Sequence, residues 1–134
     1  QLVLNASRIF SETVVSRQDR YRVANVRRPM YGQSPWIVNT GLFYTPLNNL
    51  DLALNLHSYG PRVVTVGMNR HGDDEYEQAF HSLDAEITWR LGDWSLSLGA
   101  GNLLNSRTEY RQSGVVTGRF SPGRSVNAGV RYHF

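Results

Sequence analysis

Hydrophobic and polar residues alternate one by one over several stretches of this chain. In the stretch 81–91, one parity is apolar: Leu83, Ala85, Ile87, Trp89 and Leu91. The residues between them are polar or charged. Successive side chains of a β-strand point to opposite sides, so this period of two is typical of a strand with one apolar and one polar face. We therefore predict a strand over residues 81–91.

Five other segments repeat the pattern, and together they predict an all-β, antiparallel fold. The other predicted strands cover residues 1–7, 36–44, 50–57, 93–100 and 125–134. The connections between these six strands alternate between short and long. The short ones are 45–49, rich in turn residues, and Gly92–Asp93, which suits a two-residue hairpin. The long, polar ones cover residues 11–35, 60–80 and 105–123.

This alternation of connections is typical of an outer-membrane β-barrel, with tight periplasmic turns and long extracellular loops. The apolar segment 62–67 is interpreted as an outer strand part that projects beyond the bilayer. Alternation alone does not say whether the apolar face meets lipid or the dry interior of a soluble, lipocalin-like barrel. We therefore turn to the positions of the aromatic rings.

Most rings of the apolar parity lie at strand ends, with aliphatic residues between them. Those at the short-turn end are Tyr44, Trp89, Trp94, Tyr132 and Phe134, and Trp36 lies at the other end. Rings at both ends of a strand are typical of the aromatic girdles that flank a lipid band. The opposite face is then expected to meet a watery lumen or a plug. Its candidates are Asn39, Asn55, His57, Asp84, Glu86, Arg90, Arg131 and His133.

Composition narrows the possible chemistry. The chain has 134 residues, which corresponds to one domain or part of one, and no cysteine, which excludes disulfides, thiolate metal sites and cysteine nucleophiles. No stretch approaches the roughly 18 consecutive apolar residues of a membrane-spanning helix. All 14 basic residues are arginine, and the formal net charge is +3. Arginine suits bidentate contacts with phosphates and carboxylates.

Two clusters in the long connections could bind charged partners. The acidic segment 71–77 contains His71, Asp73, Asp74, Glu75 and Glu77, which could ligate calcium but lack the spacing of a known calcium loop. The arginine-rich segment 16–29 could contact lipopolysaccharide phosphates, although a solvated loop is the simpler reading. We predict no nucleic-acid partner, because the basic residues do not alternate with aromatics on a regular element.

An enzymatic function is not expected, and no cofactor is predicted. His81 and Ser82 are adjacent and so point to opposite faces of a strand, which excludes a nucleophile–base pair. Asp84 and Glu86 share a face about 7 Å apart, but no nucleophile or metal ligand accompanies them. We expect these two carboxylates to pair with a plug or with Arg90.

The last strand resembles the β-signal by which bacterial outer-membrane proteins are recognised by the barrel assembly machinery. The matching positions are Asn127, Gly129, Tyr132 and Phe134. Three longer motifs resemble TonB-dependent receptors, especially those of the Bacteroidetes, and appear in the family's order. They are RRPMYGQSPWIVNTGLFY at 27–44, AGNLLN at 100–105 and SPGRSVNAGVRYHF at 121–134.

The resemblance implies that residues 1–134 are the C-terminal part of a receptor barrel, about six strands of a roughly 22-stranded one. The plug domain and the earlier strands are absent from this stretch. Implied partners are the lipid bilayer, lipopolysaccharide, the assembly machinery, the rest of the barrel and plug, and TonB. The implied location is the bacterial outer membrane, and the implied function is uptake of a scarce ligand. Two alternatives remain: a small outer-membrane barrel of about eight strands with a structural or adhesive role, and a soluble lipid-binding β-barrel.

Overall fold

The computed structural model describes residues 1–68 and 72–134, and within them the chain is all-β with antiparallel strands. None of the described segments forms a helix long and apolar enough to cross a membrane. The strands form a six-stranded, a four-stranded and a two-stranded sheet. The predicted antiparallel all-β class is therefore confirmed.

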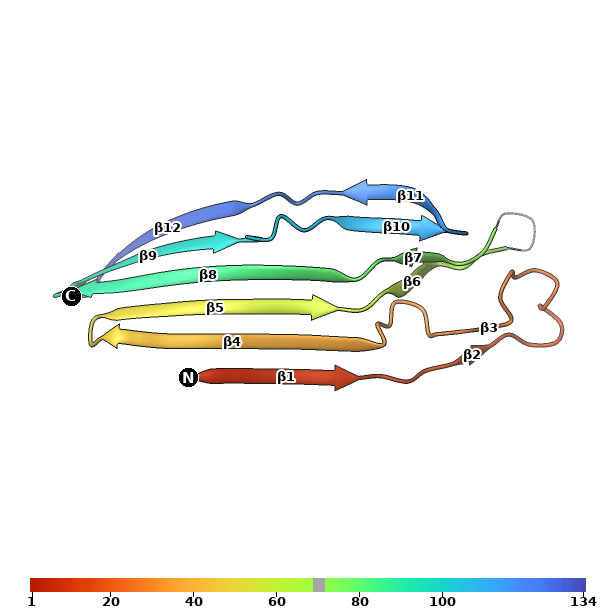
Figure 1. Ribbon diagram of the computed structural model, residues 1–134, viewed down its shortest axis with the longest axis horizontal. Helices are drawn as coiled ribbons and strands as arrows, with labels where there is room; N and C mark the ends of the chain where they lie inside the picture. The colour runs from red at the N-terminus through yellow and green to blue at the C-terminus, as the bar shows by residue number, and fades with distance from the viewer. Residues whose placement is uncertain (69–71) are drawn as a thin grey trace.

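The six-stranded sheet contains all six predicted strands, each beside its neighbour in the predicted series (Figure 1). Its strands, in order across the sheet, are β1 (Leu2–Arg8), β4 (Trp36–Leu47), β5 (Leu50–Tyr59), β8 (Phe80–Leu91), β9 (Trp94–Gly101) and β12 (Ser125–Tyr132). The sheet is open, because β1 and β12 have strand neighbours on one side only within the described residues. These six strands do not close into a barrel by themselves.

The long connections carry short strands of their own. One of them lies within segment 62–67, which was predicted as an outer strand part, and the others were not predicted. The additional strands are β2 (Thr13–Val14), β3 (Arg27–Arg28), β6 (Arg62–Thr65), β7 (Glu75–Glu77), β10 (Thr108–Gln112) and β11 (Val115–Phe120). The four-stranded sheet has the order β11-β10-β7-β6, which continues β12-β9-β8-β5 toward the far end of the molecule (Figure 1). We call the four strands β6, β7, β10 and β11 the outer sheet.

Both short turns join strands at the same end of the six-stranded sheet (Figure 1). The turn predicted over 45–49 is shorter in the structure, because β4 continues to Leu47 and only Asn48 and Asn49 remain outside strands. The strand register shifts between Tyr44 and Leu47, around Pro46, which has no N–H to donate to a ladder. The predicted hairpin at Gly92–Asp93 is present, and Gly92 has a φ of 58° that suits a tight hairpin turn.

The six-stranded sheet is a single layer without a covered core. Val63, in the outer sheet, is the one buried hydrophobic residue among those described. Large apolar side chains of the main sheet are open, for example Leu98 at 51% and Val126 at 75% exposure. The described chain therefore covers neither face of this sheet.

Candidate functional site

The strand register collects the apolar parity of all six strands on one side of the sheet. This apolar face consists of even-numbered residues 2–6, 38–44, 50–56, 94–100 and 126–132 and odd-numbered residues 83–91. No position in these ranges carries a charged side chain. A row across its middle illustrates the continuity, since Ile87, Leu98 and Ala128 are paired from β8 through β9 to β12. Unbroken apolar surface of this extent is typical of a face that meets lipid or another protein.

Aromatic rings line both ends of the apolar face. At the short-turn end, Trp94 lies 4.9 Å from Tyr132, and Tyr132 lies 5.2 Å edge-on from Phe134, measured between ring centroids. At the far end, Trp36 stacks on His81 with centroids 6.2 Å apart. Tyr and Trp rings are enriched where apolar surface gives way to water at membrane interfaces.

The opposite side, the polar face, carries the residues predicted to face a lumen or plug. The register places Asn39 beside His57, Asn55 beside Asp84, and Arg90 and Arg131 on either side of Ser95. Glu86 shares this face, paired with Gly99. His133 lies one residue beyond β12, where its N–H donates to the carbonyl oxygen of Asp93 at 2.9 Å.

Direct side-chain contacts join only some of these candidates. Asn39 and His57 contact each other through Oδ1 and Nδ1. Arg90 forms its ion pair with Asp51, on the neighbouring strand β5. Of the two expected partners of Glu86, Arg90 is therefore wrong, because four residues along a strand separate their Cα atoms by about 13 Å. Pairing with a plug stays a prediction.

Asp84 does not pair with Arg90 either, and its carboxylate accepts hydrogen bonds from two other residues. Its Oδ1 accepts hydrogen bonds from the Ser82 hydroxyl at 3.0 Å and from the Asn102 backbone N–H at 2.7 Å. Asp84 thereby fixes the end of β9, where the main sheet gives way to the outer connection.

Asn102 is a structural centre that the sequence pattern alone did not identify. It is 8% exposed and has a φ of 52°, a left-handed conformation that a residue other than glycine adopts only when its surroundings hold it there. Its Nδ2 donates to the carbonyl oxygens of Ser106 at 3.1 Å and Gly123 at 2.8 Å, and its Oδ1 accepts from the Ser106 N–H at 2.8 Å. Asn102 therefore ties the AGNLLN motif to the glycine of the SPGR segment.

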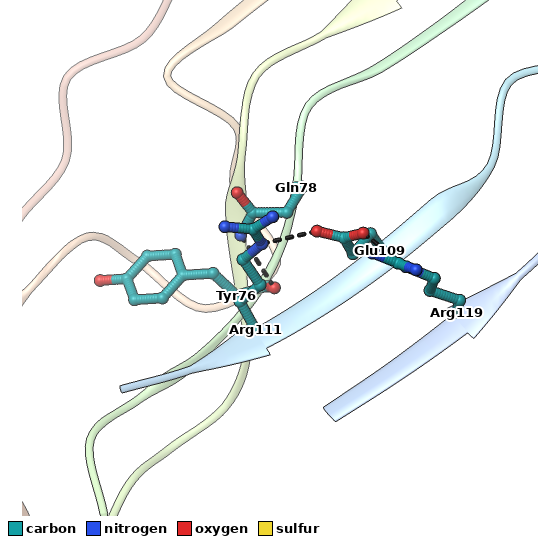
Figure 2. A network of polar contacts seen from close by, with 5 residues as sticks. All are labelled: Tyr76, Gln78, Glu109, Arg111 and Arg119. Carbon is teal, nitrogen blue, oxygen red and sulfur yellow. Dashed lines mark hydrogen bonds and ion pairs between the residues drawn. The ribbon is translucent and has the colours of Figure 1, made fainter. Parts of the chain in front are cut away.

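In the outer sheet, two carboxylates are each held by more than one donor. Buried Glu77 accepts from the Tyr59 hydroxyl at 2.7 Å and from Arg62 Nε and Nη2, both at 2.9 Å. The hydrogen bond to Glu77 raises the pKa of Arg62. Glu109 receives Arg111 Nε on Oε1 at 2.5 Å and Arg119 Nε on Oε2 at 2.7 Å (Figure 2). Glu77 thereby links β7 to Arg62 on β6, and Arg119 links β11 to Glu109 on β10, whereas Arg111 and Glu109 lie on the same strand.

Acidification is expected to loosen the β10–β11 hairpin. The hydrogen bonds from Arg111 and then Arg119 hold the pKa of Glu109 below that of a free glutamate side chain. A depressed carboxyl pKa contributes stability above the unfolded pKa, and this contribution is lost as the pH falls through the folded value. The protection factors of the amides in residues 108–120, which correct for slower intrinsic exchange in acid, should therefore fall below about pH 4.5 and fall less at high salt. Glu109→Gln should remove this pH dependence, and an unchanged acid response in that variant would contradict the assignment.

The acidic segment 71–77 does not form a metal centre in the described part of the chain. His71 lies outside the described residues. Asp74 accepts from the Gly67 N–H, and Glu75 from the Thr65 and Thr117 hydroxyls. Within residues 1–68 and 72–134, no three His, Cys, Asp or Glu side chains gather as a metal site would require.

The arginine-rich segment 16–29 makes mainly exposed contacts. Arg22 lies 3.7 Å from Asp19, and Arg27 lies 3.6 Å from Glu12. His81 and Ser82 lie on opposite faces as predicted, because His81 is paired with Ser58 and Ser82 with His57.

No family model, no curated protein and no solved structure matches the chain.

Proposed function

We propose that this chain is part of a TonB-dependent outer-membrane receptor, with its six main strands embedded in the bilayer as one sector of a larger barrel. The receptor would take up a scarce ligand in an energy-dependent manner. The observation that carries the proposal is the apolar face. It crosses all six strands, carries no charged side chain short of Arg8 at the far end of β1, and is left uncovered by the described chain.

Energetics favour a lipid environment for this face. Transferring one Leu or Val side chain from water to an apolar medium contributes about 1.5–3 kcal/mol, and the face has many such residues. The length of the three longest strands also fits, because β4 and β8 have 12 residues each and β5 has 10, and a transmembrane strand needs about 9–11. The three motifs that resemble TonB-dependent receptors supply the more specific part of the proposal.

The two alternatives are less well supported. A soluble lipid-binding barrel needs an enclosed interior, whereas the six-stranded sheet is open and single-layered in the described residues. A small independent barrel of about eight strands would need further strands, and no motif here points to one. Both edge strands, β1 and β12, present free backbone groups that lipid cannot satisfy. These edges are consistent with pairing to neighbouring strands of a larger barrel.

Fractionation and gene sequence together test the proposal. The native protein should be found in the outer-membrane fraction and need detergent for extraction. The reading frame upstream of the Gln1 codon should encode earlier strands, a plug and a segment that contacts TonB. A protein that remains in the soluble fraction would contradict the membrane assignment. A membrane protein whose gene encodes no plug would contradict the receptor assignment alone.

The orientation makes a separate prediction. Single cysteines at Arg27 or Arg119 should react with an impermeant maleimide added to intact cells, because both side chains are exposed at the long-connection end. Cysteines at Asn48 or Asp93, in the short turns, should react only after the outer membrane is opened. External labelling at Asn48 in intact cells would reverse the orientation.

Phe134 is expected to act in assembly. Phe134→Ala should lower the amount of receptor in the outer membrane, because the ring completes the terminal pattern and packs against Tyr132. It also removes ring burial at the interface, which costs up to about 3 kcal/mol. Phe134→Trp keeps a ring and serves as the control. Uptake per inserted receptor should be unchanged, and normal abundance of Phe134→Ala would show that the terminal ring is incidental.

A further inference from the structure

Positive charge is concentrated in residues 102–124, which connect β9 to β12. This segment contains four arginines (Arg107, Arg111, Arg119 and Arg124) and one carboxylate, Glu109. Its formal charge of +3 equals the net charge of the whole chain, so the rest of the chain has a net charge of zero. A local excess of this size attracts anionic partners.

The single carboxylate of the segment, that of Glu109, already binds two arginines. Both oxygens of Glu109 accept hydrogen bonds, one from Arg111 and the other from Arg119 (Figure 2). Within residues 1–68 and 72–134, Arg107 forms no ion pair, and the guanidinium of Arg124 has one hydrogen bond, from Nε to the carbonyl oxygen of Leu103 at 3.1 Å. Two exposed arginines therefore remain available for an external anion.

The fold brings together the backbone of the residues that precede these two arginines. Asn102 Nδ2 donates to the carbonyl oxygens of Ser106 and Gly123, so two stretches separated in sequence meet at one amide group. Arg107 directly follows the first of these residues, and Arg124 directly follows the second. This junction lies immediately beyond Ala100 and Val126, which end the apolar face on β9 and β12.

Apolar side chains accompany the charges. Leu103 and Leu104 lie in the same turn and are 37% and 51% exposed. Exposed leucines beside unpaired arginines, at the margin of an apolar face, match a lipid with acyl chains and an anionic headgroup. An acidic protein or a free anion would use the arginines and leave the leucines exposed to water.

We propose that Arg107 and Arg124 bind the phosphate of a lipid headgroup in the outer leaflet, with Leu103 and Leu104 against its acyl chains. This inference rests on the proposed function, because it requires the apolar face to lie in the bilayer. Guanidinium groups hold phosphate through charge-assisted hydrogen bonds. The site would anchor the β9–β12 sector at the extracellular membrane surface.

The test measures lipid binding to the full-length protein in neutral detergent, by native mass spectrometry. The probes are phosphatidic acid, diacylglycerol with the same acyl chains, and inorganic phosphate as a competitor. The wild type should prefer phosphatidic acid to diacylglycerol. Arg107→Gln and Arg124→Gln combined should weaken phosphatidic acid binding by roughly tenfold, and Arg107→Gln alone by roughly threefold.

Matched variants and competitors make each outcome decisive. Arg90→Gln with Arg131→Gln removes the same charge from the polar face, at the short-turn end of the sheet, and should leave binding unchanged. An equal loss in this control, or no loss in Arg107→Gln, would overturn the proposal. Displacement of the lipid by equimolar inorganic phosphate would indicate a free-phosphate site and would also overturn it. If the protein enters the outer membrane but lacks the phosphate preference, this inference alone fails, whereas absence from the membrane defeats both proposals.

Discussion

Leu98→Arg is expected to lower the free energy of unfolding in membranes by about 2–4 kcal/mol, because it would place a charge in the middle of the proposed lipid band. Leu98 is 51% exposed and is paired with Ile87 and Ala128 on the apolar face. Ser97 precedes it on the same strand and lies on the polar face, paired with Thr88 and Gly129. Ser97→Arg inserts the same side chain toward water and should cost much less.

Urea titration of both variants in lipid vesicles measures the difference. The two substitutions are adjacent in sequence and introduce the same residue, so strand propensity and total charge are matched. Outer-membrane abundance in cells should follow the same order. Equal destabilisation by the two arginines would show that the apolar face does not meet lipid.

Asn102→Ala is expected to be the most destabilising polar substitution outside the lipid band, at about 3 kcal/mol or more. It removes three side-chain hydrogen bonds, worth about 0.5–1.5 kcal/mol each, with Ser106 and Gly123. It also leaves alanine at a φ of 52°, which costs roughly 1–2 kcal/mol. Loss of this centre should release the AGNLLN turn from the start of β12.

Asn102→Gly separates the two contributions. Glycine adopts the left-handed conformation freely but makes no side-chain hydrogen bonds, so it should recover only the conformational part. Urea stability and amide exchange of residues 102–107 and 121–125 provide the measurement. If Asn102→Ala were as stable as the wild type, the hydrogen bonds to Ser106 and Gly123 would not be holding the turn.

The main sheet could be predicted from the sequence because its strands have one apolar and one polar side. The period of two in residues such as Leu83, Ala85 and Ile87 predicts both the strand and which of its side chains share a face. The turn at Gly92–Asp93 was predictable because a two-residue hairpin favours residues that tolerate a positive φ. The shared side of all the polar candidates follows from the same parity.

Of the outer sheet, only β6 was predicted, from the apolar segment 62–67. Strands such as β7 (Glu75–Glu77) have no apolar alternation, and they are held by backbone pairing and by ion pairs such as Arg62 with Glu77. Asn102 was noticed as part of a motif, but its left-handed conformation depends on contacts with residues 4 and 21 positions away. The Arg90–Asp51 pair likewise required the strand register, which composition does not reveal.

Solvent accessibility along β9 tests the central claim most directly. The chain has no cysteine, so single cysteines at Ser95, Leu96, Ser97 and Leu98 can be compared without a background signal. With a water-soluble maleimide and the full-length protein in native outer membranes, we expect faster reaction at 95 and 97 and protection at 96 and 98. The same four variants unfolded in urea should all react alike. Reaction in the membrane as fast at 96 and 98 as at 95 and 97 would contradict a lipid-facing apolar surface.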